Sequence, residues 1–291
     1  MKTSSSFSSS SSETKVCSRT ITRRTLPIGA FAVLLLAAIG AAAQTTNGLS
    51  NKEIQGRQLV EKLLAEQPAE NFTNTGVLQI RNAKGTTKGV PLKVETIVTP
   101  TNWQNIYSSP NDTNIPHTIF QLTVIHASRS NEYYITFLGS TNWGWWSGNL
   151  PEEREPAIVT VLRVPYGLGA MLELPFVGSD FWLCDLGLEF FHWPDQKILK
   201  SDTARSRLCK ILESTNPNPS AHGYSRVDSW IDNESLGIVQ AKAYDAKGKL
   251  LKEFYPKDFK KVSGQWQVGS MEIDNVQTRS RSTLKFDLKV K

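Results

Sequence analysis

The sequence has few of the residues from which common catalytic sites are built. Its 291 residues include only four His, three Cys and three Met. Four motifs are absent: the P-loop, the H-E-x-x-H of zinc peptidases, the C-x-x-C of thiol redox proteins and the G-x-S-x-G of serine hydrolases. We therefore expect no enzyme of these classes, no cofactor and no metal centre.

A strongly basic surface is also not expected. The formal net charge is +6, but residues 1–43 contain five basic residues and one acidic residue, so the rest of the chain carries only +2. Domains that bind nucleic acid usually have a concentrated basic face. We therefore expect no nucleic-acid partner.

The longest apolar run is too short for a membrane-spanning helix, which needs about 20 residues. It covers residues 28–40, follows a Ser-rich stretch poor in acidic residues, and is followed by Ala41-Ala42-Ala43. This pattern predicts a cleavable signal peptide over residues 1–43, with cleavage near Ala43, and a periplasmic protein. Arg23-Arg24 leaves the twin-arginine export route open. The alternatives are an uncleaved membrane anchor and an organelle transit peptide.

Two cysteines, Cys184 and Cys209, remain after removal of this leader. An even number of cysteines in an oxidising compartment is compatible with a disulfide. The alternative is a pair of separate buried thiols, because free cysteine packs as a small apolar residue.

The remaining chain, residues 44–291, is predicted to form a single domain of mainly antiparallel β-structure. Apolar residues at helical spacing predict one amphipathic helix over residues 50–66, with Ser50 and Glu53 as a capping box. Alternating apolar and polar residues then predict about ten strands, separated by turn sequences such as Asp245-Ala-Lys-Gly248. There is no βαβ rhythm, so a nucleotide-binding α/β fold is not expected.

One polar cluster is a candidate metal site: Asp185, Glu189, His192 and Asp195. On a helix the first three would share a face on which a metal could bind. Aromatic residues interleave with them, and an exposed polar edge is the simpler interpretation. A Ser–His–Asp triad stays open in principle, because its members need not be close in sequence.

Several motifs in the C-terminal half resemble a known family. They are Gly178-Ser-Asp-Phe181 followed by Asp185-Leu186, the strand Tyr224-Ser-Arg-Val-Asp-Ser-Trp-Ile-Asp232, and Tyr244-Asp-Ala-Lys-Gly-Lys-Leu-Leu-Lys252. Together they are similar to motifs of the bacterial outer-membrane lipoprotein-sorting (LolA-like) family. The similarity covers residues 178–288 well, whereas residues 100–160 match poorly.

The resemblance implies an incomplete, half-open antiparallel β-barrel with an N-terminal helix and short helices over its concave face. It also implies a non-enzymatic carrier for lipoprotein acyl chains or other lipid, with an inner-membrane donor complex and an outer-membrane acceptor as partners. The loop motif (Gly178, Ser179, Asp180, Phe181 and Asp185) would mainly fix the backbone, because both carboxylates can cap the following helix or accept backbone N–H bonds.

The sequence contains eight Trp, seven Tyr and twelve Phe, which can fill a core or line a cavity. Bulk and strand position select six candidate lipid-binding residues: Trp103, Phe120, Phe137, Trp182, Phe190 and Trp230. Trp143, Trp145 and Trp146 lie in a loop-like segment that could touch a membrane. The rival interpretations are an envelope lipid sensor or scaffold on the same fold and, from another class, a lipid hydrolase.

Overall fold

The computed structural model describes residues 49–110, 118–138, 159–165, 169–262 and 265–288. The predicted signal peptide and the Trp143–Trp146 segment lie outside these residues. In the described part of the chain, no helix is long and apolar enough to cross a membrane. The described residues form one compact unit.

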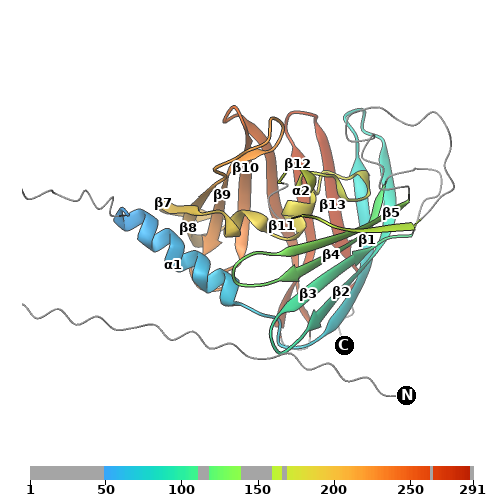
Figure 1. The fold of residues 1–291 in the computed structure, drawn as a ribbon, viewed down its shortest axis with the longest axis horizontal. Helices are drawn as coiled ribbons and strands as arrows, with labels where there is room; N and C mark the ends of the chain where they lie inside the picture. The colour runs from blue at the N-terminus through green and yellow to red at the C-terminus, as the bar shows by residue number, and fades with distance from the viewer. Residues whose placement is uncertain (1–48, 111–117, 139–158, 166–168, 263–264, 289–291) are drawn as a thin grey trace, which may run out of the picture. The chain divides into compact units, whose positions relative to one another are not determined.

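In the described residues, thirteen strands form one continuous antiparallel sheet (Figure 1). Their order is β6-β5-β4-β3-β2-β1-β13-β12-β11-β10-β9-β8-β7, so pairing of β1 with β13 joins the two halves of the chain. The strands of the first half are β1 (Phe72–Arg81), β2 (Thr87–Val98), β3 (Trp103–Ser108), β4 (Ile119–His126), β5 (Glu132–Leu138) and β6 (Val159–Arg163). Those of the second half are β7 (Asp195–Ala204), β8 (Arg207–Thr215), β9 (Tyr224–Asp232), β10 (Ile238–Asp245), β11 (Leu250–Val262), β12 (Gln265–Asn275) and β13 (Ser280–Phe286).

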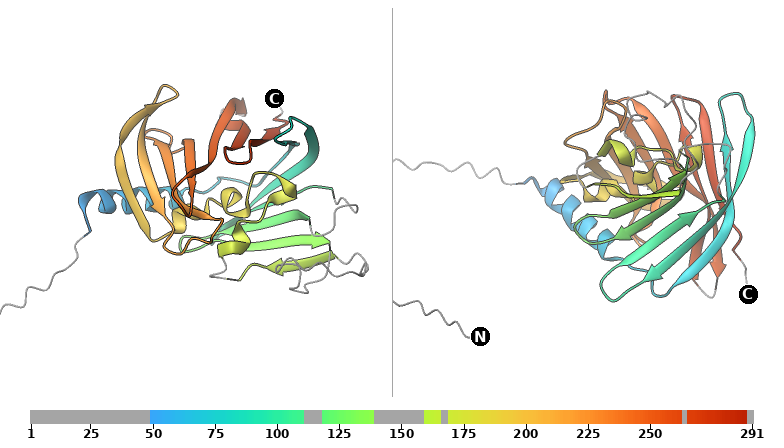
Figure 2. Two further views of the ribbon diagram at one scale, coloured as in Figure 1. Left: turned by 90° about the horizontal axis from the view of Figure 1, so that it is seen from above. Right: turned by 45° about the vertical axis from the view of Figure 1, so that its right-hand side comes forward.

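The sheet is not closed, because β6 and β7 form its two edges and do not pair with each other. The chain leaves one edge at β6 and enters the other at β7. Between these strands lies a segment that we call the crossing segment, described over residues 169–194. Its described residues form four short helices: α2 (Gly169–Leu172), η2 (Phe176–Gly178), α3 (Leu183–Leu186) and η3 (Glu189–His192). Figure 2 shows these helices against the inner face of the curved sheet. The predicted mainly antiparallel, half-open architecture is therefore present.

Two apolar clusters fill the space between this segment and the inner face. The first joins Phe176, Phe181 and Leu183 of the crossing segment to inner-face residues of β1–β5, β12 and β13, such as Leu78 and Leu284. The second joins Phe190 and Phe191 to inner-face residues of β7–β11, including Leu212 and Val227. Burial of apolar area contributes about 25 cal/mol per Å², so these clusters hold the crossing segment on the sheet.

The N-terminal helix α1 (Asn51–Ala65) begins at the predicted capping box. Ser50 accepts a hydrogen bond from the backbone N–H of Glu53, and Glu53 accepts one from the backbone N–H of Ser50. Leu59 and Val60 are buried in the second cluster. The helix packs against β7, where a Cβ atom added to Gly56 would lie 2.6 Å from Lys197 Cα. Glycine is thus required for this close approach.

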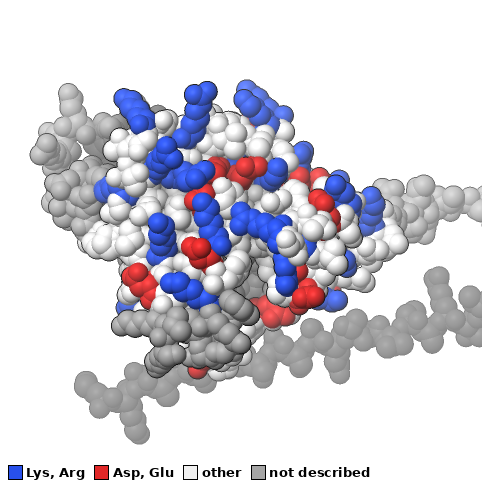
Figure 3. Space-filling model, turned by 180° about the vertical axis from the view of Figure 1, so that it is seen from behind, with Lys and Arg blue, Asp and Glu red and all other residues white. Residues whose placement is uncertain are grey.

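The outer face of the sheet is largely polar. Ion pairs link neighbouring strands there, including Lys242 with Glu253 and Lys257 with Glu272. On the face shown in Figure 3, basic and acidic side chains of the described residues are interspersed. A partly exposed pair such as Lys242–Glu253 contributes about 0–1 kcal/mol.

The two cysteines do not form a disulfide in this structure. Both are buried free thiols. Cys184 belongs to α3 and packs in the second cluster on the inner face. Cys209 pairs in register with Asp232, on the outer side of β8 and β9, whereas its neighbours Leu212 and Val227 point inward. The sheet separates the two thiols, so of the two alternatives that the sequence left open, the structure has the pair of separate buried thiols.

Candidate functional site

Hydrogen bonds from β11 and β13 hold the loop motif Gly178–Phe181 in place. Gly178 has a φ of +70°, a conformation that glycine adopts without the strain of a Cβ atom. The Asp180 carboxylate accepts hydrogen bonds from the hydroxyls of Ser280 and Ser282, and its backbone N–H donates to Ser282 Oγ at 2.8 Å. Phe181 is buried in the first cluster. This arrangement fixes the backbone of the loop.

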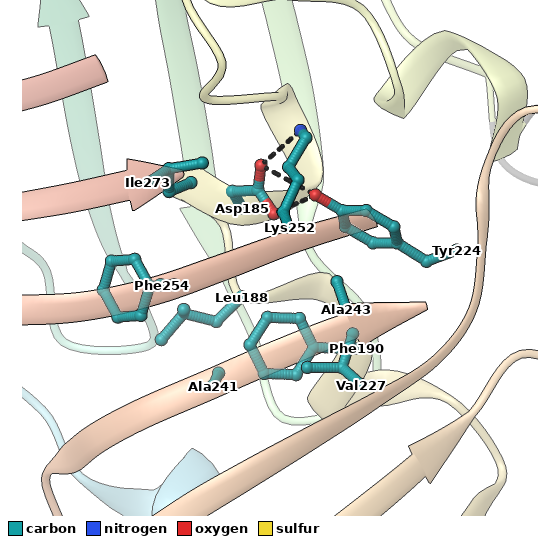
Figure 4. Close-up of a pocket in the computed structure, with 10 residues that line it drawn as sticks. All are labelled: Asp185, Leu188, Phe190, Tyr224, Val227, Ala241, Ala243, Lys252, Phe254 and Ile273. Carbon is teal, nitrogen blue, oxygen red and sulfur yellow. Dashed lines mark hydrogen bonds and ion pairs between the residues drawn. The ribbon is translucent and has the colours of Figure 1, made fainter. Parts of the chain in front are cut away.

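Asp185 is the centre of a buried polar network beneath this loop. Its carboxylate accepts hydrogen bonds from the backbone N–H of Trp182 at 2.8 Å and from the hydroxyl of Tyr224 at 2.9 Å. Lys252 Nζ lies 3.3 Å from the same carboxylate and donates to the backbone carbonyl of Asp180 at 2.7 Å. Figure 4 shows the three side chains converging.

Burial lowers the pKa of Lys252, against the opposing effect of Asp185, because it disfavours the charged ammonium. Burial raises the pKa of Tyr224, and the nearby Asp185 carboxylate raises it further. The Lys252 ammonium also lies 3.4 Å from the centre of the Trp182 ring, which stacks on Tyr224. The adjoining cavity measures only about 30 Å³, the share of one water molecule. We therefore assign a structural role to these residues.

A much larger cavity, of about 650 Å³, lies at the end of α1. It has the size typical of small-molecule sites. Its apolar wall comes from α1, η3, the β9–β10 turn and strands β10–β12, through Leu63, Leu64, Leu188, Phe191, Leu236, Ile238, Phe254, Val268 and Met271. A cavity with such an apolar wall, at the end of a helix, has room for part of an alkyl chain.

One side of this cavity is polar. His126, Asn131 and His192 line it, and Glu189 lies behind them; we refer to these four residues as the polar corner. Asn131 Nδ2 lies 2.8 Å from the carbonyl of Gly187 and 3.1 Å from Glu189 Oε2. The same Glu189 oxygen accepts a hydrogen bond from Tyr133 at 2.8 Å.

Burial controls the protonation of the polar corner. It raises the pKa of Glu189 to about 7, against the opposing effect of the hydrogen bonds from Tyr133 and Asn131. It lowers the pKa of His126 to about 4, helped by the proximity of His192 and opposed by Asn131. The pKa of His192 is also lowered by burial, so both imidazoles are neutral at pH 7.

The structure places the six aromatic candidates in different environments. Trp103 lines the large cavity and stacks on His126 with ring centres 3.8 Å apart. Phe190 borders the small cavity, and Trp182 belongs to the Lys252 network. Phe137 is 1% exposed and is a core residue of the first cluster. Phe120 lies at a register shift in β4 and is half-buried.

Trp230 is on the wrong side of the sheet for the predicted cavity. It pairs in register with Ile211 and Gln240, and its indole N–H donates to Asp202 at 3.3 Å on the outer face. Lys242 lies over its ring. The alternation of β9 directs Val227 and Ile231 inward, and therefore directs Trp230 outward.

The polar cluster considered as a metal site is dispersed in the structure. Asp185 belongs to α3, Glu189 and His192 to η3, and Asp195 begins β7. A left-handed residue, Leu188, separates the two short helices. Among the described residues, no group of three or more His, Cys, Asp and Glu side chains could hold a metal ion.

Sequence reasoning missed most of the large cavity. Asn131 ends the polar run Arg129-Ser-Asn131, which is typical of an exposed turn, yet it is only 8% exposed. Ile238 and Val268 look like ordinary strand residues. These residues are far apart along the chain, and only the crossing of the short helices and the docking of α1 bring them together.

Comparison with solved structures defines the fold. A putative outer membrane lipoprotein-sorting protein domain from Vibrio parahaemolyticus superposes with a TM-score of 0.60 and 16% identity, covering 81% of this chain and 92% of that one. A DUF1329 family protein from Desulfovibrio piger has a TM-score of 0.58 and 17% identity, covering 83% and 96%. A LolA superfamily protein from Nitrosomonas europaea has a TM-score of 0.51 and 13% identity, covering 83% and 94%.

The chain therefore has a LolA-like fold, and the resemblance inferred from the motifs is confirmed at the level of the fold. A family model described as "-like: Uncharacterized protein" matches residues 156–290, which include all the motifs that carry the resemblance. Comparison with curated proteins gives no match.

Proposed function

We propose that this protein is an exported, non-enzymatic carrier that holds lipoprotein acyl chains or another lipid in the 650 Å³ cavity. The observation that carries this proposal is the cavity itself, with its apolar wall built from α1 and the inner face of the sheet. The lipoprotein-sorting domain that shares its fold supports the same assignment.

The energetics favour such a ligand. Each methylene group removed from water contributes about 0.8 kcal/mol. A carrier competes with a membrane only if it encloses much of the chain, and the cavity offers apolar side chains from three directions: α1, the crossing segment and β10–β12. Trp103 adds a large aromatic surface at one end.

We further propose that residues 1–43 are removed on export to the periplasm and that residues 44–291 act as a single domain. In this scheme the carrier receives its cargo from an inner-membrane donor complex and delivers it to an outer-membrane acceptor. Because the sheet ends at the edge strands β6 and β7, it does not close into a barrel around the crossing segment and α1.

Native mass spectrometry tests the proposal. The protein is expressed with its leader, recovered from the exported fraction without detergent, and measured intact. We expect the mass of a processed chain plus a lipid or an acylated peptide, and transfer of this cargo to acceptor vesicles. A ligand-free mass with no uptake of added lipid would contradict the carrier function.

The same preparation separates the rival functions. A stable protein partner without lipid transfer would favour an envelope sensor or scaffold on this fold. Turnover of an ester substrate, lost on replacement of a single Ser or His, would favour a hydrolase.

A further inference from the structure

The crossing segment occupies much of the inner face of the sheet with its own side chains. Phe176, Phe181 and Leu183 pack against β1–β5, β12 and β13 in the first cluster, and each is at most 2% exposed. The large cavity lies beside the last part of the segment, where Leu188 and Phe191 line it. A ligand therefore has the volume of this cavity and not the whole inner face of the sheet.

Buried polar contacts fix this boundary. Lys252 of β11 donates to the carbonyl of Asp180 at 2.7 Å and lies 3.3 Å from the carboxylate of Asp185. At the end of the segment, Gln196 of β7 donates to the carbonyl of Phe190 at 2.9 Å. Separating a buried ion pair leaves an uncompensated charge and is strongly destabilising. Displacement of the crossing segment by a ligand is therefore costly, and the cavity volume limits the cargo.

The cavity opens at a rim of exposed polar residues. They come from the end of α1 and from the turns β2–β3, β4–β5 and β9–β10: Glu66, Gln67, Thr101, Ser128 and Ser235. Such a rim suits the polar end of an amphiphile, which stays in water while its alkyl chain lies against the apolar wall. The cavity volume then has to hold the alkyl part alone.

The volume of about 650 Å³ sets the length of chain that fits. A methylene group is about as large as a water molecule, whose share of liquid volume is about 30 Å³. The cavity thus has room for about 20 such groups. One chain of 16 carbons fits, whereas two chains need about 1,000 Å³ and three need about 1,400 Å³.

We propose that the cavity holds a single alkyl chain and that the cargo is a monoacylated amphiphile, in preference to a diacyl or triacyl lipid. This inference rests on the proposed function and specifies its ligand class. Each methylene group that leaves a membrane and finds no apolar partner lowers the partition constant about fourfold. A second chain left outside the cavity would therefore keep its lipid in the membrane.

The experiment uses three lipopeptides that share one peptide and carry one, two or three 16-carbon acyl chains. Each is mixed in detergent with the delipidated exported protein and phosphatidylcholine vesicles. Dialysis removes the detergent, so that each lipopeptide partitions between vesicles and protein, and flotation separates the two.

We expect one monoacyl molecule per protein, counted by native mass spectrometry. The ratio of protein-bound to vesicle-bound lipopeptide should be at least about a hundredfold lower for the diacyl and triacyl forms.

A substitution connects the limit to the cavity. Val268→Trp places a larger side chain in the cavity from β12. A 12-carbon chain should then gain at least about fivefold in affinity relative to a 16-carbon chain, compared with the unsubstituted protein. Val276→Trp, at an exposed position in the turn between β12 and β13, is the matched control and should leave this ratio unchanged. Circular dichroism confirms that the variants fold, and the comparison of the three lipopeptides needs no variant.

The outcomes separate this inference from the proposed function. Comparable partition of the monoacyl and diacyl forms, comparable partition of all three, or two monoacyl molecules per protein would overturn the single-chain limit and leave the carrier function intact. An unchanged chain-length ratio in a folded Val268 variant would also overturn it, because the chain would then lie outside this cavity. Failure of the protein to take up any of the three lipopeptides would overturn the carrier function itself.

Discussion

At the scale of single residues, the clearest energetic consequence concerns Lys252, which is 2% exposed. Replacing it by Met leaves the Asp180 carbonyl without its buried donor and the Asp185 carboxylate without its positively charged partner. Breaking one half of a buried pair typically costs about 3–5 kcal/mol, so we expect Lys252→Met to lower the free energy of unfolding by that amount. Urea denaturation measures the change.

The matched control is Lys242→Met, because Lys242 forms a partly exposed ion pair with Glu253 on the outer face. Its expected effect is below about 1 kcal/mol. Equal costs for the two substitutions would show that the Lys252 network does not hold the crossing segment.

Glu189 makes stability depend on pH. Its pKa rises from 4.5 to about 7 on folding, so the folded state binds more protons than the unfolded state between these values. The stabilisation from the protonated carboxyl is fully present below pH 4.5 and is lost as the pH rises through about 7. A shift of this size corresponds to about 3 kcal/mol.

We therefore expect Glu189→Gln to be more stable than the unsubstituted protein at pH 8 and nearly equal to it at pH 4.5. His126 and His192 act in the opposite direction, because their lowered pKa values destabilise the fold as the pH falls. They are common to both proteins and cancel in the difference. A difference in unfolding free energy that is independent of pH would refute the role of Glu189.

At the scale of secondary-structure elements, the docking of α1 on β7 depends on Gly56. Alanine is a better helix former by about 1 kcal/mol, yet its Cβ would lie 2.6 Å from Lys197 Cα. We expect Gly56→Ala to destabilise the protein by about 1–3 kcal/mol and to speed hydrogen exchange in residues 51–65. Gln55→Ala, at an exposed neighbouring position, should have little effect. Stabilisation by Gly56→Ala would mean that α1 is not packed as described.

The sequence predicted about ten strands, whereas the described residues form thirteen, and β7 is one that the alternation of apolar and polar residues does not reveal. The strand reads DQKILKSDTA, and its polar residues fit an edge position in which only Gln196, Ile198 and Ala204 are buried. Such a strand lacks the regular alternation that identifies β2. By contrast, the capping box at Ser50 and Glu53 depends on local spacing alone, and it correctly predicted the start of α1.

Local sequence patterns do not predict which residues line the large cavity. Trp103 was selected for its bulk and does line the cavity, whereas Trp230 was selected on the same ground and faces outward. The difference depends on register, since one residue along a strand reverses the face. Asn131 and His192 carry no local signal at all, because their shared environment is created by chain segments about 60 residues apart.

At the scale of the whole molecule, blocking the cavity should abolish lipid uptake without unfolding the sheet. Ile238→Trp places a large side chain in the cavity from the start of β10. We expect at least a tenfold loss of affinity for an acyl probe, measured by titration, with an unfolding midpoint close to that of the original protein. Val161→Trp, on the exposed side of edge strand β6, is the control and should bind normally. Undiminished binding to the Ile238 variant would place the lipid elsewhere.

The most direct test of the central claim is photo-crosslinking with an acyl chain that carries a diazirine near its end, followed by peptide mapping. The account predicts labels on the wall of the large cavity, in residues 63–67, 187–192 and 235–238. Labels confined to the outer face around Trp230, or spread evenly over the surface, would contradict it.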